Sequence, residues 1–327
     1  MSQGHSGKVR AFLLAFLMAT ISMSASLPSW EFSTLEEKSA FQTYSTNSTV
    51  DLVLGRTNTI PTNIVGNTST GTFETESETD SLRFTSSPIE SAGKISISSN
   101  FACGIFGDIN LKCWGYNTLG QLGIGSTISQ TTPQTVNLGI GRTATAFSLG
   151  LSGTNACATL DNGSLKCWGR NTYGELGIGG TTGYSVVYTT PQAVDLGTGR
   201  TAVSVSMGGS HTCAILDDGS LKCWGQGSSG QLGIGSVADS TIPQSVNLGT
   251  GRIAVSVSTG YSHTCVILDD GTLKCWGNGY SGTLGIGSEV NQITPQTVNL
   301  GAGRTAISVG SGNTHTCAIL DDGSLKC

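Results

Sequence analysis

The chain has 327 residues, of which 11% are charged, and its formal net charge is -5. Residues 1–92 hold 5 basic and 9 acidic side chains, and residues 93–327 hold 11 basic and 12 acidic ones. Neither region has the surplus of basic residues with which proteins bind phosphate backbones, so the composition argues against a nucleic-acid partner.

The N-terminus has the pattern of an export signal. Lys8 and Arg10 precede an apolar run from Ala11 to Met23, and small residues follow at Ser24 to Ser26. The run is shorter than the ~20 residues that a transmembrane helix needs, which favours a cleaved signal peptide over 1–26 rather than an uncleaved anchor. No second apolar run follows, so we expect a mature chain without a membrane span, secreted or held at the cell surface.

Residues 27–92 have the composition of a linker. Of these 66 residues, 24 are Ser or Thr, and only Val50 to Leu54 reads as a strand. A segment with so few apolar residues buries little surface, which predicts a Ser/Thr-rich linker or disordered segment. Sequons for N-linked glycans begin at Asn47 and Asn67, and a third begins at Asn162; each is a site only in a host that makes such glycans.

Residues 93–327 are periodic. The first cysteines of successive copies, Cys103, Cys157, Cys213, Cys265 and Cys317, are separated by 54, 56, 52 and 52 residues. Each unit contains alternating strand patterns, a short hairpin and a glycine-rich loop, which predicts four strands and no helix. We therefore expect an all-β fold, a β-propeller of four-stranded blades with repeats of about 50 residues. The predicted units are 94–146, 147–204, 205–256, 257–308 and a partial unit over 309–327.

A second cysteine follows the first by ten residues in every copy. In the third copy, a three-residue turn at Asp217 to Gly219, with glycine in the left-handed region, places Cys213 opposite Cys223. Such a non-hydrogen-bonded pair has its Cα atoms ~4.5 Å apart, which a disulfide tolerates. A disulfide of this loop size contributes roughly 3 kcal/mol in the chain-entropy model. The same count pairs Cys103 with Cys113, Cys157 with Cys167, Cys265 with Cys275, and Cys317 with Cys327.

Free thiols and a metal site are the alternatives to these disulfides. The nine residues between the two cysteines differ from the short spacing that is typical of zinc sites. Reduced, buried cysteines would be expected if the chain stayed in the cytosol. The export signal favours the disulfides.

The stretch from His211 to Ser236, HTCAILDDGSLKCWGQGSSGQLGIGS, resembles the repeat of the regulator of chromosome condensation family. The resemblance rests on a Gly-x-x-His, an Asp-Gly turn, a Trp-Gly step and a Gly-Gln-Leu-Gly loop. The Trp-Gly steps begin at Trp114, Trp168, Trp224 and Trp276, and Glu175 and Thr283 replace the Gln of the loop in two copies. It covers residues 94–327 and implies a propeller, commonly of seven blades.

Two departures from that family bear on function and completeness. The nuclear members of the family are not exported and do not carry a cysteine pair in every hairpin. The sequence holds four full units and the start of a fifth, which favours a fragment of a larger ring. Alternatively, Thr85 to Ser91 resembles the outer strand Thr131 to Leu138 and would close a ring of five blades.

The repeated polar residues are expected to have structural roles. His211, His263 and His315 would be satisfied by backbone groups near the inner strands, and a shared metal site is disfavoured because blades are widely spaced. The arginines before each inner strand predict a repeated hydrogen bond, and the paired aspartates suit turns rather than calcium binding. No nucleophile–base pair or phosphate-binding loop stands out, so we expect no enzyme activity, no metal and no cofactor.

The sequence therefore favours a non-catalytic, monomeric module that binds a protein partner through loops between its strands. The insert Thr181 to Tyr188 accounts for the 56-residue spacing, and its Tyr184 and Tyr188 are the candidate contact residues. Nucleotide exchange on a small GTPase, as in the founding member of the family, is the alternative. No loop residue of that activity can be assigned to this chain.

Overall fold

The computed structural model describes residues 41–46, 49–54, 71–75, 81–86, 94–106, 110–180 and 186–327. The chain divides into two compact units, 1–90 and 91–327. The division lies close to the predicted boundary at residue 92. The predicted signal peptide lies outside the described residues.

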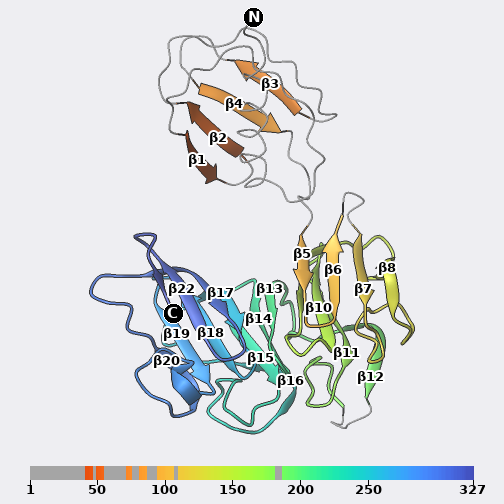
Figure 1. Cartoon of the computed structure of the whole chain (residues 1–327). Coiled ribbons are helices and arrows are strands. Elements are labelled where there is room, and N and C mark those ends of the chain that lie inside the picture. The colour runs from red at the N-terminus through yellow and green to blue at the C-terminus, as the bar shows by residue number, and fades with distance from the viewer. Residues whose placement is uncertain are drawn as a thin grey trace, which may run out of the picture. The chain divides into compact units, whose positions relative to one another are not determined.

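Four strands occur in the first unit, where the sequence predicts a linker with a single strand-like run. They are β1 (Phe41–Thr46), β2 (Thr49–Leu54), β3 (Gly71–Thr75) and β4 (Ser81–Ser86), which form one antiparallel sheet in the order β1-β2-β4-β3. Threonine and aromatic residues favour strands, so a segment rich in Thr and poor in long apolar runs can still form a sheet (Figure 1). The linker prediction omitted three of these four strands.

The second unit consists of five consecutive antiparallel sheets, which confirms the predicted all-β fold with four-stranded blades. A short 3-10 helix, η1 (Tyr280–Gly282), lies between β19 and β20, where the sequence predicts no helix. Each sheet runs from inner to outer strand in chain order, and the fifth has three strands. Their bounds are β5 (Ile95–Ile97), β6 (Phe101–Ile105), β7 (Leu111–Gly115) and β8 (Gln130–Thr135); β9 (Ala144–Leu149), β10 (Asn155–Leu160), β11 (Leu165–Arg170) and β12 (Val187–Ala193); β13 (Ala202–Met207), β14 (His211–Leu216), β15 (Leu221–Gly225) and β16 (Ser240–Ser245); β17 (Ala254–Thr259), β18 (His263–Leu268), β19 (Leu273–Gly277) and β20 (Gln292–Thr297); and β21 (Ala306–Ser311), β22 (Thr316–Leu320) and β23 (Leu325–Lys326).

Two details of the strands differ from the expected ones. The predicted unit boundaries fall inside the inner strands, which begin at Ala144, Ala202, Ala254 and Ala306. The segment Thr131 to Leu138 predicts an outer strand with Pro133 at its start, whereas Pro133 lies within β8, at a register shift between Cys113 and Gly115 of the neighbouring strand. A proline is tolerated there because β8 is an edge strand and the irregularity removes the need for a ladder donor.

The hairpins have the predicted register. Cys213 lies opposite Cys223 and Ile215 lies opposite Leu221, and Gly219 closes the turn with a φ of 76°. All ten cysteines form disulfides within their own hairpins, with Cα atoms 4.0 or 4.1 Å apart. These are the five pairs that the spacing predicts. Because disulfides persist in oxidising surroundings, they indicate an oxidising compartment.

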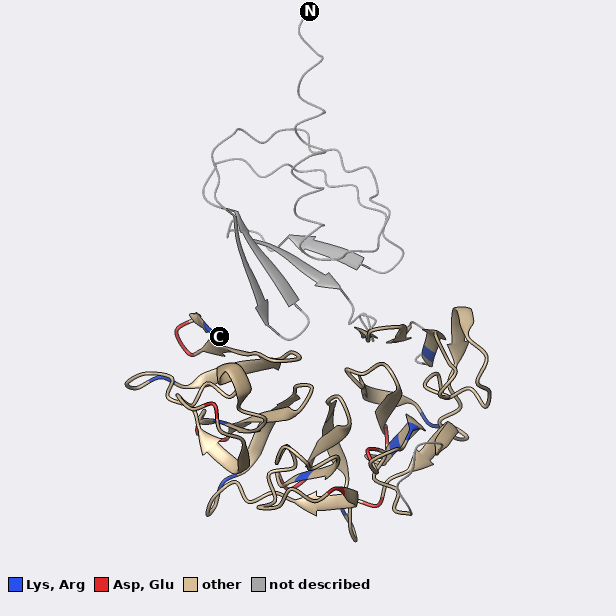
Figure 2. Ribbon diagram, turned by 60° about the horizontal axis from the view of Figure 1, so that its bottom comes forward, with Lys and Arg blue, Asp and Glu red and all other residues tan. Residues whose placement is uncertain are grey.

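The hydrophobic core lies between blades rather than within them. One cluster joins Leu111 and Leu138 of the first blade to Leu160 and Trp168 of the second, and equivalent clusters follow at the next three interfaces. Figure 2 shows the five blades side by side in an arc, and inner strands contact those of the next blade. Stacking of the blades is therefore what buries each blade's apolar surface.

The structure does not show the five-bladed closure that the sequence left open. Thr85 and Ser86 of the proposed closing segment pair with Thr72 and Gly71 in the sheet of the first unit. The remainder of that segment lies outside the described residues. The last sheet contains only β21, β22 and β23.

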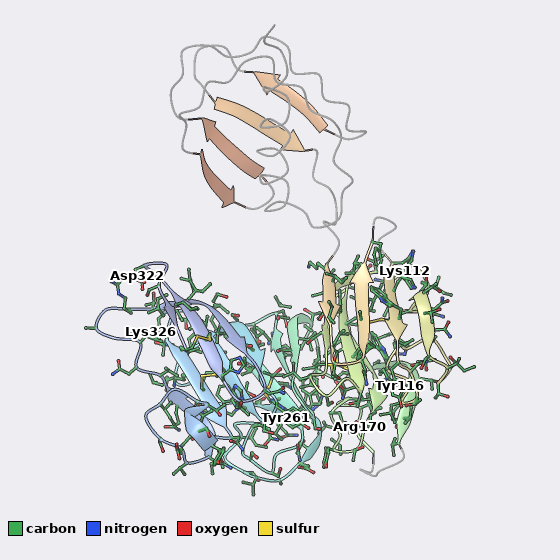
Figure 3. The ribbon with its side chains drawn as sticks, in the orientation of Figure 1. Lys112, Tyr116, Arg170, Tyr261, Asp322 and Lys326 are labelled. Atoms are coloured by element: carbon green, nitrogen blue, oxygen red, sulfur yellow. A yellow bond between two sulfur atoms is a disulfide. The ribbon has the colours of Figure 1, made fainter. Side chains whose placement is uncertain are left out.

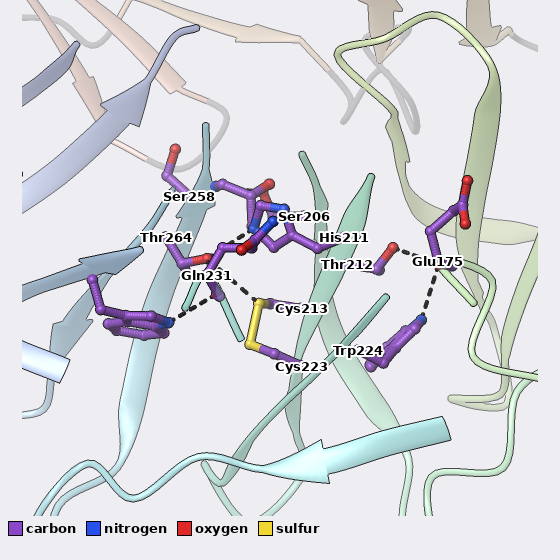
Figure 4. Close-up of a disulfide and its surroundings, with 12 residues drawn as sticks. Glu175, Ser206, His211, Thr212, Cys213, Cys223, Trp224, Gln231, Ser258 and Thr264 are labelled. Atoms are coloured by element: carbon purple, nitrogen blue, oxygen red, sulfur yellow. Dashed lines mark hydrogen bonds between the residues drawn. A yellow bond between two sulfur atoms is a disulfide. The ribbon is translucent and has the colours of Figure 1, made fainter. Parts of the chain in front are cut away.

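Hydrogen bonds from tryptophan and threonine join each blade to the preceding glycine-rich loop. The carbonyl oxygen of Glu175 accepts the indole N–H of Trp224 at 3.0 Å and the hydroxyl of Thr212 at 2.8 Å (Figure 4). The carbonyl of Gln231 accepts the equivalent groups of Trp276 and Thr264, both at 2.9 Å. The tryptophans are thus anchors between blades, which accounts for the Trp-Gly step of the repeat.

The buried histidines extend this network. His211 Nε2 lies 2.9 Å from the Thr264 hydroxyl of the next blade, and His263 Nε2 lies 2.9 Å from Thr316. Because Thr264 donates its one proton to Gln231, it must accept from His211, which fixes the proton on Nε2. The role is structural, as predicted, but the partner of each histidine is a hydroxyl of the next blade rather than a backbone group.

Candidate functional site

The blades expose two chemically different surfaces. The loops after the first and third strands of each blade form one surface, which we name the loop face. The hairpin turns and the connections between blades form the opposite surface, the turn face. Figure 3 places Tyr116, Arg170 and Tyr261 at the lower edge of the blades and Asp322 at the upper edge.

The turn face carries most of the charge, in a repeated pattern of ion pairs. Arg200 contacts Asp217 and Asp218 at 3.3 and 3.1 Å. The equivalent arginines are Arg142, Arg252 and Arg304, which pair with Asp161, with Asp269 and Asp270, and with Asp321 and Asp322. These pairs hold the hairpin turn against the segment before the inner strand. They are the repeated arginine hydrogen bonds that the sequence predicts. Because the charged groups are exposed, each ion pair contributes little to the free energy of folding.

The loop face is nearly uncharged and exposes large apolar and aromatic side chains. Tyr116, Tyr261 and Tyr280 are 46%, 48% and 71% exposed. Ile128, Val237 and Val290 are exposed on the same loops. Among the described loop-face residues, the charged side chains are Arg170, Glu175, Asp239 and Glu289. A surface of exposed tyrosines with little charge has the composition of a protein-binding patch.

A buried ion pair holds Arg170 on this face. Its Nε donates to Glu175 Oε1 at 3.3 Å, and its Nη2 donates to Ser210 Oγ of the next blade at 3.1 Å. Glu175 is fully buried, and burial raises the pKa of its carboxyl, although hydrogen bonds from Tyr173 N–H and Arg170 oppose the change. Gln226 and Gln231 occupy the equivalent positions of the third blade, 3.5 Å apart. The charge pair is thus specific to the second blade.

One side-chain contact and one backbone contact connect Arg170 to Tyr261 through the loop that contains Gly209 and Ser210. Ser210, which binds Arg170, follows Gly209, whose N–H donates to the Tyr261 carbonyl at 3.1 Å. A Cβ on Gly209 would lie 3.0 Å from the Tyr261 ring, so glycine allows that ring to approach the loop. Arg170 and Tyr261 therefore flank one loop of the third blade. Together with Ser210 they form the candidate site, and Tyr116 holds the position of Arg170 in the first blade of the same face.

Of the two predicted contact residues, Tyr184 and Tyr188, the second lies among the described residues. Tyr184 lies outside the described residues. Tyr188 lies in β12 opposite Gly169, where it is half-buried against the core that contains Leu176 and Trp224. Packing is therefore part of the role of Tyr188, and its contact with a partner stays a prediction.

The sequence patterns do not single out four exposed or loop-face residues of this surface, which are Tyr116, Tyr261, Tyr280 and Arg170. A signal for them exists, because each departs from the residue that other copies carry at its position. Tyr261 corresponds to Gly209, and Tyr280 corresponds to Ser228. Departures from a structural repeat mark residues that the shared fold does not require.

The described residues contain no group of three or more His, Cys, Asp and Glu side chains placed to hold a metal ion. No helix among them is long and apolar enough to cross a membrane. The two buried histidines, His211 and His263, form hydrogen bonds with threonine hydroxyls of the next blade.

Comparison with known proteins identifies the family. The family described as "Regulator of chromosome condensation (RCC1) repeat" matches residues 113–157, 162–215, 218–267 and 270–319. A second description of the same repeat matches residues 202–231 and 254–283. The chain therefore belongs to the RCC1 repeat family.

Curated relatives share the repeats but are longer. The ultraviolet-B receptor UVR8 of Arabidopsis thaliana is 30% identical over 244 residues, which cover 73% of this chain and 54% of that protein. The E3 ubiquitin-protein ligase HERC2 of Homo sapiens is 29% identical over 209 residues, 64% of this chain and 4% of that protein. The chain thus spans about half of the first relative and a small part of the second.

Solved structures support the fold. The structure of human WBSCR16 superposes with a TM-score of 0.61 at 18% identity, covering 86% of this chain and 72% of that chain. Yeast RCC1 (Prp20), solved with Kap60 bound, gives a TM-score of 0.61 at 18% identity, with coverages of 82% and 61%. At these identities the likeness concerns the fold alone.

Proposed function

We propose that this member of the RCC1 repeat family is a non-catalytic, monomeric module, secreted or held at the cell surface, that binds a protein partner through its loop face. The observation that carries the proposal is the exposure of Tyr116, Tyr261 and Tyr280 on a face with almost no charge. Aromatic residues and arginine dominate binding energy at protein interfaces. Among the described residues of this surface, Arg170 supplies the single basic group, and Glu175 and Ser210 orient it.

Two further observations support this assignment. Five disulfides favour a location outside the cytosol. Yeast RCC1, a protein of the same fold, binds Kap60, which offers a precedent for a protein partner of a member of this fold. The turn face is a weaker candidate because its arginines and aspartates already satisfy one another.

Nucleotide exchange on a small GTPase is the alternative function. No residue of this chain carries it specifically, and the disulfides argue against a cytosolic partner. The two proposals differ in one measurement. An exchange factor accelerates nucleotide release from the GTPase, and a binding module for an extracellular protein leaves that rate unchanged.

We expect a photo-crosslinking residue to capture the partner when it replaces Tyr261. The matched control carries the same residue in place of Ile140, which is fully exposed on the turn face. Irradiation of the protein among cell-surface and secreted proteins of its source, followed by mass spectrometry, should give a specific adduct from position 261 alone. Adducts of equal yield from both positions, or from position 140 alone, would show that the loop face is not the binding surface.

With the partner identified, the double variant Tyr116→Ala/Tyr261→Ala should bind it about 30- to 1,000-fold more weakly by calorimetry, because hot-spot side chains contribute about 1–2 kcal/mol each. The variant Arg170→Gln/Glu175→Gln reproduces the neutral pair of the third blade, so its fold should be kept while the basic group is lost. We expect it to weaken binding about 10-fold. Unchanged affinity in both variants would contradict the proposed site.

A further inference from the structure

The hairpin turn of the second blade differs chemically from its counterparts in the three blades that follow it. The turn between β10 and β11 reads Asp161-Asn162-Gly163-Ser164, whereas residues 217–220, 269–272 and 321–324 read Asp-Asp-Gly followed by Ser or Thr. The single change from aspartate to asparagine creates Asn-Gly-Ser. This is the acceptor sequence for N-linked glycans.

The geometry of this turn suits an acceptor. Asn162 is exposed on the turn face. The Ser164 hydroxyl donates to Asn162 Oδ1 at 2.7 Å, and the Ser164 backbone N–H donates to the same oxygen at 3.1 Å. Both donors polarise the amide through its oxygen and leave the nitrogen, which is the atom that takes the sugar, uninvolved in these bonds. Gly163 has a φ of 76°, which places the hydroxyl beside the amide within one tight turn.

The neighbouring arginine does not compete for the Asn162 side chain. In the later blades Arg200, Arg252 and Arg304 each contact both aspartates of the turn. Arg142, the equivalent residue here, contacts Asp161 at 3.1 Å. An amide carries no charge to attract a second contact from the guanidinium. The residue at position 162 is therefore the one member of this set that no ion pair holds against the blade.

We propose that Asn162 is a glycosylation site, modified from a lipid-diphosphate-linked oligosaccharide during export. In this transfer the amide nitrogen of Asn162 forms a bond to the anomeric carbon of the sugar. The bond from that carbon to the diphosphate oxygen breaks, the lipid diphosphate leaves with the bonding electrons, and the amide gives up one proton. No oxidant or reductant is needed. The inference rests on passage through an export compartment and is independent of which partner the loop face binds.

A glycan at Asn162 would lie away from the candidate binding site. The hairpin turn lies on the turn face, and the candidate site at Arg170 and Tyr261 lies on the loop face. A glycan at Asn162 would cover the surface that already carries the paired charges and leave the exposed tyrosines accessible. Enzymatic removal of the glycan should leave partner affinity unchanged within about 2-fold, since the two surfaces lie at opposite ends of the strands.

The experiment is peptide mapping of the full chain recovered from the medium of a eukaryotic secretory cell line. Trypsin releases residues 143–166, which contain the one Asn-x-Ser/Thr sequence of the propeller unit. We expect this peptide to carry a glycan, and a peptide N-glycosidase in ¹⁸O-labelled water should convert Asn162 to a labelled aspartate. Asn162→Asp, which restores the residue of the other blades, and Ser164→Ala should each abolish the modification.

A matched variant tests whether the turn itself is a competent acceptor. Asp218→Asn installs the same sequence in the equivalent turn of the third blade, and we expect it to add a second glycan. An unmodified peptide 143–166 from secreted protein would overturn the proposal, whether or not the Asp218→Asn turn is modified. Because the readout is mass, this result does not depend on partner binding, so failure here and failure of the proposed function are distinguishable.

Discussion

Acidification from pH 7 to pH 5 should destabilise the protein by about 2 kcal/mol for each of His211 and His263. Both imidazoles are buried, and burial is the main cause that lowers the pKa of His211 to about 3 and that of His263 to about 4, with the neighbouring histidine adding to each shift. Protonation would place a proton on Nδ1, which is buried without a partner in both residues. At pH 5 both imidazoles are therefore mostly neutral in the folded state and mostly protonated in the unfolded chain.

The sign follows from the linkage between protonation and folding. Each folded pKa lies below the ordinary value of 6.5, so the unfolded state binds more protons as the pH falls. The contribution is complete above about pH 6.5 and is lost progressively toward pH 3 to 4. The aspartates at the turns, Asp218, Asp270 and Asp322, have a lowered pKa because Ser or Thr groups bind them, so they act only below this window.

Denaturant unfolding at pH 7 and pH 5 measures this effect, and His211→Asn is its control. Asn155 occupies the equivalent position in the second blade, so the fold accepts asparagine there. The variant should lose about 2 kcal/mol less on acidification than the native chain. Glu175, whose pKa is raised by burial, is present in both proteins and cancels in the comparison. Equal acid sensitivity of both proteins would show that His211 is not the group responsible.

Replacement of Trp224 by alanine should cost about 4 kcal/mol of folding free energy, within the range for deletion of a buried aromatic ring. The indole is fully buried and packs on the glycine-rich loop of the preceding blade. A Cβ on Gly177 would lie 2.5 Å from the indole nitrogen, and Gly177 has a φ of 72°. Gly177→Ala should therefore also destabilise, by about 2 kcal/mol from overpacking and strain.

Trp114 provides the matched control. It has the same place in its Trp-Gly step but is only half-buried, with its ring 6.2 Å from that of Phe106. Trp114→Ala should cost less than half as much as Trp224→Ala, because less apolar surface is lost. Thermal and urea unfolding of both variants measure the difference. Equal losses would mean that the tryptophan stabilises its own blade rather than the contact between blades.

The repeat unit was predictable because it is local. The register of Cys213 and Cys223 follows from the turn at Asp217 to Gly219, and turn chemistry is encoded in neighbouring residues. The start of the inner strand is harder to predict from neighbouring residues. A β-bulge separates Ala202 from Ser204, so period-2 alternation misplaces that end of the strand.

The candidate site was harder to predict because several blades contribute to it. Arg170 reaches Ser210 across a blade interface, and Gly209 connects that contact to Tyr261. The partner of His211 is Thr264, which lies 53 positions away in the next blade. A single sequence shows that such residues recur, but it does not show which copies face one another. The exposed tyrosines were difficult to predict for a further reason, which is that aromatic residues in a repeat also serve as packing anchors.

We expect the mature protein to be a propeller with a disulfide in every hairpin, formed in an oxidising compartment, and mapping of the cysteines in natively produced protein is the decisive measurement. Peptides prepared under non-reducing conditions, with free thiols blocked beforehand, should show each pair linked within its own hairpin, as in Cys213 with Cys223, and no free thiol. That result would direct the search for partners outside the cytosol. Ten free thiols would contradict the account, and assays of nucleotide exchange on small GTPases would then be the next test.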